Sequence, residues 1–312
     1  MASQNRAIVD KLLSNVSSAY MPQGLVGDKL LPFIGVKQSS GLLGKYGTRH
    51  LAIENSVKVG KSKYRQVEPI VRTSTSYLIR GHGLEGIVTK DDYRNVESPF
   101  KAEQDETMGL TNMIMLEKEK ILADALTSTS VLTQNATLSG TDQWSDYSNS
   151  RPMEKVSDCR MTIADKIGIL PNKIVCDMKV AEKLRYHPQL LDALGFKYAR
   201  PGGLSDSELA SAFNVDQFIV AQGRYESANE GASSSMAPIW GKDMVIMYSP
   251  NSAQPYQASL GYRLGFEGQD QRKVYKYAIN NPPESTGILV EDEYQHLVSD
   301  VNCGYLLKAV IA

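Results

Sequence analysis

The sequence contains few cysteines, and their spacing excludes the usual cysteine-based sites. Only three occur among 312 residues: Cys159, Cys176 and Cys303. They form neither a CxxC zinc motif nor the even-numbered set that a disulfide framework requires. We therefore expect reduced thiols that are buried in the protein core.

The sequence also lacks an excess of charge of either sign and any long apolar run. Its 34 lysines and arginines balance 35 acidic residues, which excludes a global basic field for holding nucleic acid or anionic lipid. No apolar run has the length of a transmembrane helix, and residues 1–20 lack the continuous apolar segment of a signal peptide. These absences predict a globular protein that is made and kept in the cytoplasm.

Two motifs that could bind a ligand lack the context that they need. Residues 81–86 match the GxGxxG pattern of nucleotide-binding turns, but no apolar helix follows, so we interpret them as a flexible turn. His82 could join Glu85, Asp91 and Asp92 in binding a metal, but their spacing does not make the side chains converge. The histidines, at positions 50, 82, 187 and 296, form no pair four residues apart on a helix. The sequence predicts no metal and no cofactor.

Patterns typical of a catalytic nucleophile are missing as well. There is no GxSxG motif, and the serines at 233–235 lie in a linker rich in glycine and alanine. Cys176 lies in an apolar strand, where a thiol acts as a small hydrophobic group. The carboxylates at 291–293 would alternate between the faces of a strand, which predicts a solvated edge. We expect no enzyme, and the alternative that remains is a site assembled from distant residues.

The first half of the chain combines an arm, an extended excursion and one long helix. Apolar residues at helical spacing between 8 and 16 predict an arm that packs against protein, and the glycines and prolines between 20 and 45 exclude a long helix there. From 45 to 80 polar residues alternate with β-branched or aromatic ones, which predicts a β-hairpin too polar to form its own core. Ser98 as cap and Pro99 begin a helix with an apolar stripe down to Leu126.

The second half predicts a compact mixed domain. A polar segment at 127–152, with Trp144 and Tyr147 as its large anchors, marks the boundary. Beyond it the pattern predicts helices at 153–168 and 178–194, and strands at 172–177, 218–225 and 243–250. The stretches 259–280 and 288–300 predict β-hairpins, and 303–312 a buried final strand. This alternation is typical of an α/β or α+β domain.

Charge is segregated along this neutral chain. Between 37 and 80 nine basic residues outnumber two acidic ones, whereas between 85 and 106 seven acids outnumber three bases. From 284 to 300 there are five acids and no lysine or arginine. This pattern favours a protein that associates with copies of itself, and the alternative is that these runs are solvated faces.

Several short motifs, together with this order of elements, resemble the major capsid proteins of tailed bacteriophages. The motifs are Ser139-Gly140, residues 143–147 (QWSDY) with Pro152, residues 171–173 (PNK), the His187-Pro188 helix end, residues 225–231 (YESANEG), residues 239–243 (IWGKD) and residues 303–308 (CGYLLK). They are spread over most of the chain, and it is their combination that is specific.

The resemblance implies an α+β fold, the tailed-phage major capsid fold, with an N-arm, an E-loop, a peripheral domain with a long spine helix, and an axial domain. Mapped onto this sequence, residues 1–45 would form the N-terminal arm and 46–97 the E-loop. Residues 98–152 would form the peripheral domain with the spine helix. Residues 153–312 would form the axial domain, with C-terminal strands that return to the peripheral domain.

The function implied by the resemblance is structural. Pentamers and hexamers of the chain would close into an icosahedral shell around double-stranded DNA, without sequence-specific binding, and a near-neutral shell would not trap the packaged phosphates. The implied partners are a separate scaffolding protein, a portal and decoration proteins, with assembly in the bacterial cytoplasm and a final location in the virion. An encapsulin-type compartment around a cargo enzyme is the alternative, because its fold and composition would look the same.

The segregated charge predicts one contact between subunits. The basic E-loop residues Lys58, Lys61, Lys63 and Arg65 would lie across a neighbouring subunit. Their partners there would be the acidic residues at the start of its spine helix, Glu103, Asp105 and Glu106.

Overall fold

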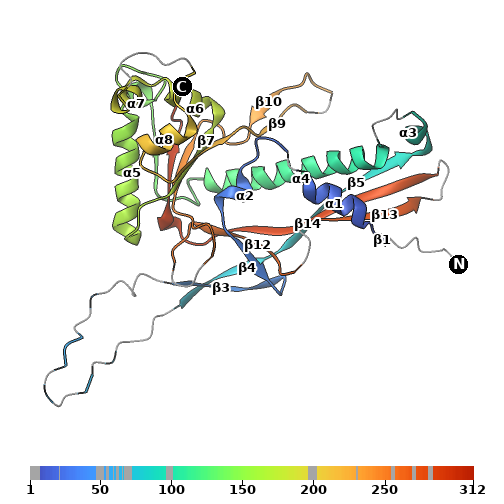
Figure 1. Cartoon of the computed structure of the whole chain (residues 1–312), viewed down its shortest axis with the longest axis horizontal. Coiled ribbons are helices and arrows are strands. Elements are labelled where there is room, and N and C mark those ends of the chain that lie inside the picture. The colour runs from blue at the N-terminus through green and yellow to red at the C-terminus, as the bar shows by residue number, and fades with distance from the viewer. Residues whose placement is uncertain are drawn as a thin grey trace.

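A computed structural model describes most of the chain (Figure 1). The described residues are 8–20, 22–46, 53, 56–58, 60, 63, 64, 66, 72–95, 101–195, 202–229, 231–253, 257–268, 272–279 and 284–312. They form a mixture of helices and mostly antiparallel sheets, in agreement with the predicted α+β class.

A 25-residue helix, α4 (Ala102–Leu126), runs from the peripheral part of the molecule into the compact part (Figure 1). Its end at Leu126 is as predicted. It begins at Ala102 with Lys101 at the N-cap, so the predicted start at Ser98 is wrong; Ser98 and Pro99 themselves lie outside the described residues. Leu110 and Ile114 face one apolar cluster and Leu122 another, so α4 links the two cores.

The peripheral part is a six-stranded sheet on which α4 and the arm pack. Its strands are β1 (Ile8–Val9), β13 (Arg272–Ile279), β14 (Ser285–Val298), β12 (Gly261–Phe266) and β2 (Phe33–Val36), in that order, with β5 (Arg80–Thr89) paired to β14. The arm adds α1 (Lys11–Ala19), capped by Asp10, and α2 (Gly27–Leu30); α3 (Lys90–Asn95) follows β5. Leu13 of α1, Val88 of β5 and Ile288 of β14 share the peripheral core with α4.

A two-stranded ribbon, β3 (Ser40–Tyr46) with β4 (Arg72–Leu78), extends away from both cores (Figure 1). We call this the β3–β4 ribbon. It lies where the hairpin is predicted, although its pairing begins at Ser40, ahead of residue 46. β5, which the predicted E-loop of 46–97 includes, belongs instead to the peripheral sheet.

The compact part contains a five-stranded sheet in the order β6 (Asn135–Thr137), β15 (Gly304–Lys308), β11 (Met244–Met247), β7 (Lys173–Asp177) and β8 (Gln217–Ala221). Its helices are α5 (Pro152–Ile167), α6 (Met178–Arg185), α7 (Pro188–Ala193) and α8 (Asp206–Ala212). The short turns η2 (Gly140–Asp142) and η3 (Val301–Cys303) and the hairpin β9 (Arg224–Glu226) with β10 (Met236–Pro238) complete the fold.

Local signals explain the ends of these helices. Pro152 occupies the first turn of α5, and Gly168 ends it with a φ of 73°, in the left-handed region that glycine adopts without a Cβ clash. α8 begins with a capping box in which Ser205 and Glu208 each bond to the other's backbone N–H. The predicted helix at 178–194 is divided in two, because Pro188 begins α7 with His187 as its N-cap.

Two predictions for the peripheral sheet are wrong. Residues 81–86 form part of β5 and not a flexible turn, because they pair with β14 along its length. The carboxylates at 291–293 do not lie on a solvated edge: β14 is flanked by β13 and β5, and Asp292 is buried.

Candidate inter-subunit surfaces and the junction that positions them

The carboxylate of Glu119 joins the arm, α4 and the compact part. Its Oε2 accepts the N–H of Gly27 at 2.6 Å, and its Oε1 accepts the indole N–H of Trp240 at 2.8 Å. The N–H of Val26 lies 3.2 Å from both oxygens. Val26 and Gly27 begin α2, whose first N–H groups need acceptors from outside the helix. A single side chain of α4 thus holds the arm and Trp240 in place.

Burial raises the pKa of Glu119, although the hydrogen bonds from Trp240 and the arm act in the opposite direction. Sequence analysis missed this residue. A signal was present, because Glu119 lies four residues after Met115 and three before Leu122, within the buried side of α4. A carboxylate at such a position needs donors from another segment.

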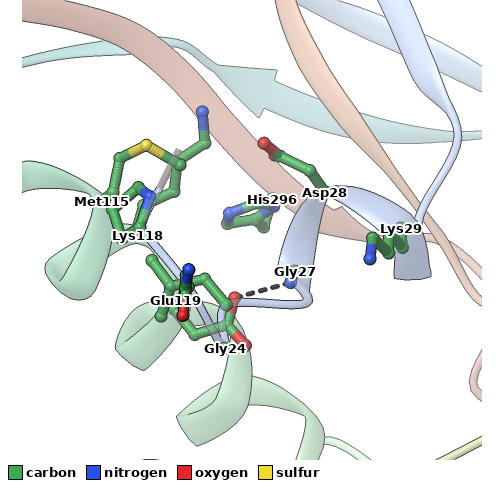
Figure 2. Close-up of a pocket in the computed structure, with 11 residues that line it drawn as sticks. Gly24, Gly27, Asp28, Lys29, Met115, Lys118, Glu119 and His296 are labelled. Carbon is green, nitrogen blue, oxygen red and sulfur yellow. Dashed lines mark hydrogen bonds between the residues drawn. The ribbon is translucent and has the colours of Figure 1, made fainter. Parts of the chain in front are cut away.

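A cavity of about 310 Å³ lies beside this junction, between residues 22–29 of the arm, α4 and β14 (Figure 2). Met115, Lys118 and Glu119 line it from α4, and His296 lines it from β14. Figure 2 shows Asp28 and Lys29 of α2 on the opposite side of His296 from α4. The arm therefore lies over α4 with a partly polar gap beneath it.

Two ion pairs, one buried and one partly exposed, connect the elements around the cavity. Lys118 Nζ lies 2.9 Å from Asp292 Oδ2, and both side chains are less than a tenth exposed. Asp28 of α2 pairs with Arg263 of β12; burial raises the pKa of Asp28, but the charges of Arg263 and Lys118 outweigh that effect and lower it overall. Removing one partner of the buried Lys118–Asp292 pair would cost about 3–5 kcal/mol, because the other charge would stay buried without a partner.

Three aromatic rings connect α4 to β5 and β14. His82 of β5 stacks on Tyr294 with ring centroids 4.5 Å apart, and His296 lies 5.4 Å from the same ring. Lys118 Nζ lies 4.5 Å above the Tyr294 ring, and His82 is 3.6 Å from Glu117. His82 therefore contacts α4 and does not converge with Glu85, Asp91 and Asp92. Within the described ranges, no group of three or more acidic, histidine or cysteine side chains could hold a metal ion.

Burial lowers the pKa of His296 to about 4, and the charges of Lys118 and Arg263 add to this effect. Neither imidazole nitrogen has a hydrogen-bond partner among the described residues. The ring is therefore neutral at neutral pH, and protonating it would place a third positive charge between Lys118 and Arg263.

The β3–β4 ribbon is attached to the peripheral sheet at its base. The N–H of Leu78 donates to the side-chain oxygen of Gln295 at 2.7 Å, and Ile79 packs with Leu264 and Leu297 in a small apolar cluster. Beyond this base the described side chains of the ribbon are mostly exposed. The ribbon thus starts in a fixed direction and carries little core of its own.

The structure describes two of the four basic residues for which a contact with a neighbouring subunit is predicted. Lys58 and Lys63 are exposed, and the ammonium group of Lys58 lies 4.9 Å from the Tyr64 ring centroid. Lys61 and Arg65 lie outside the described residues.

The acidic half of the predicted contact is at the start of α4, but its three residues differ in environment. Asp105 is exposed. Glu106 lies over Gly86, where a Cβ would clash with its carboxylate. Glu103 accepts hydrogen bonds from Tyr93 and Lys276 of its own chain. Part of the negative charge expected to meet a neighbour is therefore matched internally.

The acidic stretch 284–300 is also partly neutralised within the chain. Besides the Asp292–Lys118 pair, Glu284 pairs with Lys90 and Glu293 lies 3.4 Å from Lys273. These carboxylates meet lysines of distant segments, which a charge count along the sequence cannot reveal.

All three cysteines are buried and free, as predicted. Burial raises the pKa of Cys159 to about 12 and that of Cys176 in the same direction, so these thiols stay protonated. Among the described residues no helix combines the length and the apolar character needed to cross a membrane.

Glu119→Gln should lower the free energy of unfolding by about 2 kcal/mol at pH 7.5, since the amide NH₂ must face an N–H donor in place of one carboxylate oxygen. Urea denaturation of the unassembled subunit measures this. The control is Glu117→Gln, two residues earlier and exposed, which should change stability by less than about 0.5 kcal/mol. Equal losses in both variants would contradict the role of Glu119.

His296→Gln should make stability less sensitive to acid. Because the folded-state pKa of about 4 lies below the ordinary value near 6.5, the unfolded state binds more protons between these values, and stability falls as pH drops through this window. Between pH 7.5 and 5.0 the unchanged protein should lose about 2 kcal/mol more than the variant. Parallel stability curves over this range would contradict the assignment, whatever the offset between them.

Comparison with known proteins connects this architecture to a family. No protein-family model matches the chain. It is 27% identical over 269 residues to the major capsid protein of Burkholderia phage BcepMu, covering 84% of both chains. It is equally identical over the same length to that of Pseudomonas phage JBD67, covering 84% of this chain and 82% of the relative.

Solved structures extend the comparison to the fold. A phage-related protein from Bordetella bronchiseptica matches with a TM-score of 0.75 at 24% identity, covering 98% of each chain. An encapsulin from Synechococcus elongatus matches with a TM-score of 0.52 at 12% identity, covering 98% of this chain and 92% of the encapsulin. The chain is thus similar along most of its length to the major capsid proteins of two bacteriophages, and its α+β architecture is the fold of phage capsid proteins.

Proposed function

We propose that this chain assembles into pentamers and hexamers that close into an icosahedral shell around double-stranded DNA. The observation that carries the proposal is the β3–β4 ribbon. It extends from the body with few buried side chains (Figure 1), and an isolated two-stranded hairpin is at best marginally stable in water. A neighbouring subunit would supply the surface that it lacks.

The division into parts follows from the same proposal. The arm of residues 1–45 would secure the subunit. The E-loop of 46–97 would reach the neighbour, and the pairing of the β3–β4 ribbon at its base starts at Ser40. Residues 98–152 with α4 and residues 153–312 would serve as the peripheral and axial domains. The C-terminal strands β12, β13 and β14 contribute to the peripheral sheet, which supports the proposed return of the chain to that domain.

The partners are part of the proposal. A scaffolding protein, a portal and decoration proteins would join the shell, which would assemble in the bacterial cytoplasm and remain in the virion. The formal charge of −1 suits a wall that encloses DNA without retaining it, because strong phosphate binding needs clustered basic charge.

Purified protein, with its scaffold where required, should form capsomers or closed shells. Sedimentation velocity followed by negative-stain microscopy measures this, and nuclease protection of co-purified DNA separates a genome container from a compartment that holds a cargo enzyme. A homogeneous monomer at high concentration, with residues 46–97 resistant to protease, would contradict the proposal.

We further propose that Lys58, Lys61, Lys63 and Arg65 of one copy's E-loop lie against Asp105 and Glu106 of a neighbour, with Glu103 contributing less because Lys276 already neutralises it. Each exposed ion pair contributes about 0.2–1 kcal/mol, and a shell repeats the contact at every subunit. Salt should weaken the association, since exposed charges are screened over about 8–10 Å at physiological ionic strength.

Lys58→Glu with Lys63→Glu should raise the concentration needed for assembly about fivefold, the effect of losing about 1 kcal/mol per contact. Adding Asp105→Lys and Glu106→Lys to the same chain should restore part of the loss. The control, Lys11→Glu with Lys242→Glu, makes the same charge change at exposed sites away from the ribbon. Light scattering at low salt measures assembly, and the absence of any rescue would show that the paired residues are wrong.

A further inference from the structure

Helix α5 carries an acidic surface that the chain leaves uncovered. Glu154, Asp158, Met161 and Asp165 are exposed and are spaced by four, three and four residues, so they share one side of the helix. We call this the acidic face. The opposite side is buried in the core through Val156, Cys159, Ile163 and Ile167.

The acidic face has unmatched charge and an exposed apolar side chain at its centre. Glu154 pairs with Arg151, 3.2 Å away, but Asp158 and Asp165 have no ion-pair partner among the described residues. Met161 between them is 53% exposed. Methionine is enriched at protein interfaces relative to the rest of the surface, so the exposed Met161 makes this face a candidate for a contact.

Helix α6 carries the complementary surface. Lys179 and Lys183 are exposed one turn apart, and Tyr186, directly after the helix, is 44% exposed. We call these three residues the basic face. Neither lysine has an acidic partner in the described part of the chain, whereas the nearby Glu182 is already 3.5 Å from Arg185. The other side of α6 is buried through Val180, Ala181 and Leu184.

The two faces belong to one domain but lie apart in it. α5 contacts β15 and β11, α6 contacts β7 and β8, and α7 contacts both helices. In Figure 1, α5 forms the left margin of the compact part, while α6 lies beyond α7 at its top. On each helix the side opposite to the charged face is buried in the core. The two charged faces therefore point away from the core, and each can contact a different neighbouring copy.

We propose that the acidic face of one copy binds the basic face of the next, and that this contact closes the rings of the shell. The inference rests on the proposed self-assembly and adds a second contact to the one made by the ribbon. A contact between two different faces of identical chains is heterologous, and such contacts generate closed rings when the rotation between copies fits.

Charge and chemistry favour a second copy as the occupant. Asp158 and Asp165 can meet Lys179 and Lys183, and the thioether of Met161 can pack on the ring of Tyr186, a pairing of sulfur with an aromatic ring. Nucleic acid would satisfy the basic face but would be repelled by the acidic one. A second copy of the chain carries both an acidic and a basic face, so it can match each face of the first copy.

Two reversed variants test the contact. Asp158→Lys with Asp165→Lys, and separately Lys179→Glu with Lys183→Glu, should each raise the concentration needed to form capsomers by at least about tenfold, which equals about 1.4 kcal/mol per contact. The substituted side chains are all exposed, and circular dichroism with thermal melting checks that each variant is folded. A matched control, Asp192→Lys with Asp216→Lys, makes the same charge change at exposed positions off α5 and should assemble as the unchanged protein does.

Mixing the two variants gives the sharpest result. The variant with Asp158→Lys and Asp165→Lys has two basic faces, and the variant with Lys179→Glu and Lys183→Glu has two acidic faces. In a 1:1 mixture each variant can bind the other on both sides, so assembly should recover as rings in which the two variants alternate. Alternation allows only even-numbered rings, so native mass spectrometry should find hexamers of three plus three copies and no pentamers. A chain that carries all four reversals should form both ring sizes.

The outcomes separate this inference from the proposed function. If the unchanged protein forms no particles, the proposed function is wrong. If the unchanged protein assembles and each reversed variant assembles equally well, the proposed contact between α5 and α6 is wrong. The same conclusion follows if the mixture of folded variants does not regain assembly. In both cases the proposed self-assembly is not affected. Should a lysine or glutamate variant fail to fold, Asp158→Asn with Asp165→Asn and Lys179→Gln with Lys183→Gln repeat the test, with an expected rise of about threefold, equal to about 0.7 kcal/mol.

Discussion

The carboxylate of Glu119 is the constraint on which the arrangement of the chain depends. It is one side chain of α4, yet its acceptors bind the start of α2 and the indole of Trp240. The arm, the long helix and the compact part therefore cannot move independently without leaving buried N–H groups unpaired. The ion pairs Lys118–Asp292 and Asp28–Arg263 extend this junction to the strands that support the β3–β4 ribbon.

This junction explains how a thin molecule can present surfaces in fixed directions. Apolar packing is divided between a large core in the compact part and smaller ones under α4 and at the ribbon base. Between these cores, buried polar contacts fix the orientation of the arm, α4 and the strands relative to one another. Apolar contacts alone would fix it less specifically, because hydrophobic burial is non-directional. The ribbon, the start of α4, and the faces of α5 and α6 are then positioned relative to one another before any neighbour arrives.

Much of this fold could be predicted from sequence, and the failures have a common physical cause. The end of α4, the helix α5 and the strand β7 follow local periodicity and caps. Residues 81–86 were misread because their strand is defined by pairing with β14, some 200 residues later. The partners of Asp292 and Glu103 come from equally distant segments. A charge count along the sequence therefore could not show that Glu103, at the start of α4, pairs with Lys276 of its own chain.

In the assembly that we propose, exposed elements of the monomer become buried in contacts between copies, around a junction that stays unchanged. Hydrogen exchange of the amides, compared between monomer and assembled particle, measures this directly. We expect slower exchange on assembly in residues 56–66, in α5 around Met161 and in α6 near Lys183, with unchanged exchange in α4 around Glu119. Equal exchange of residues 56–66, α5 and α6 in both states would show that these elements do not form the contacts between copies.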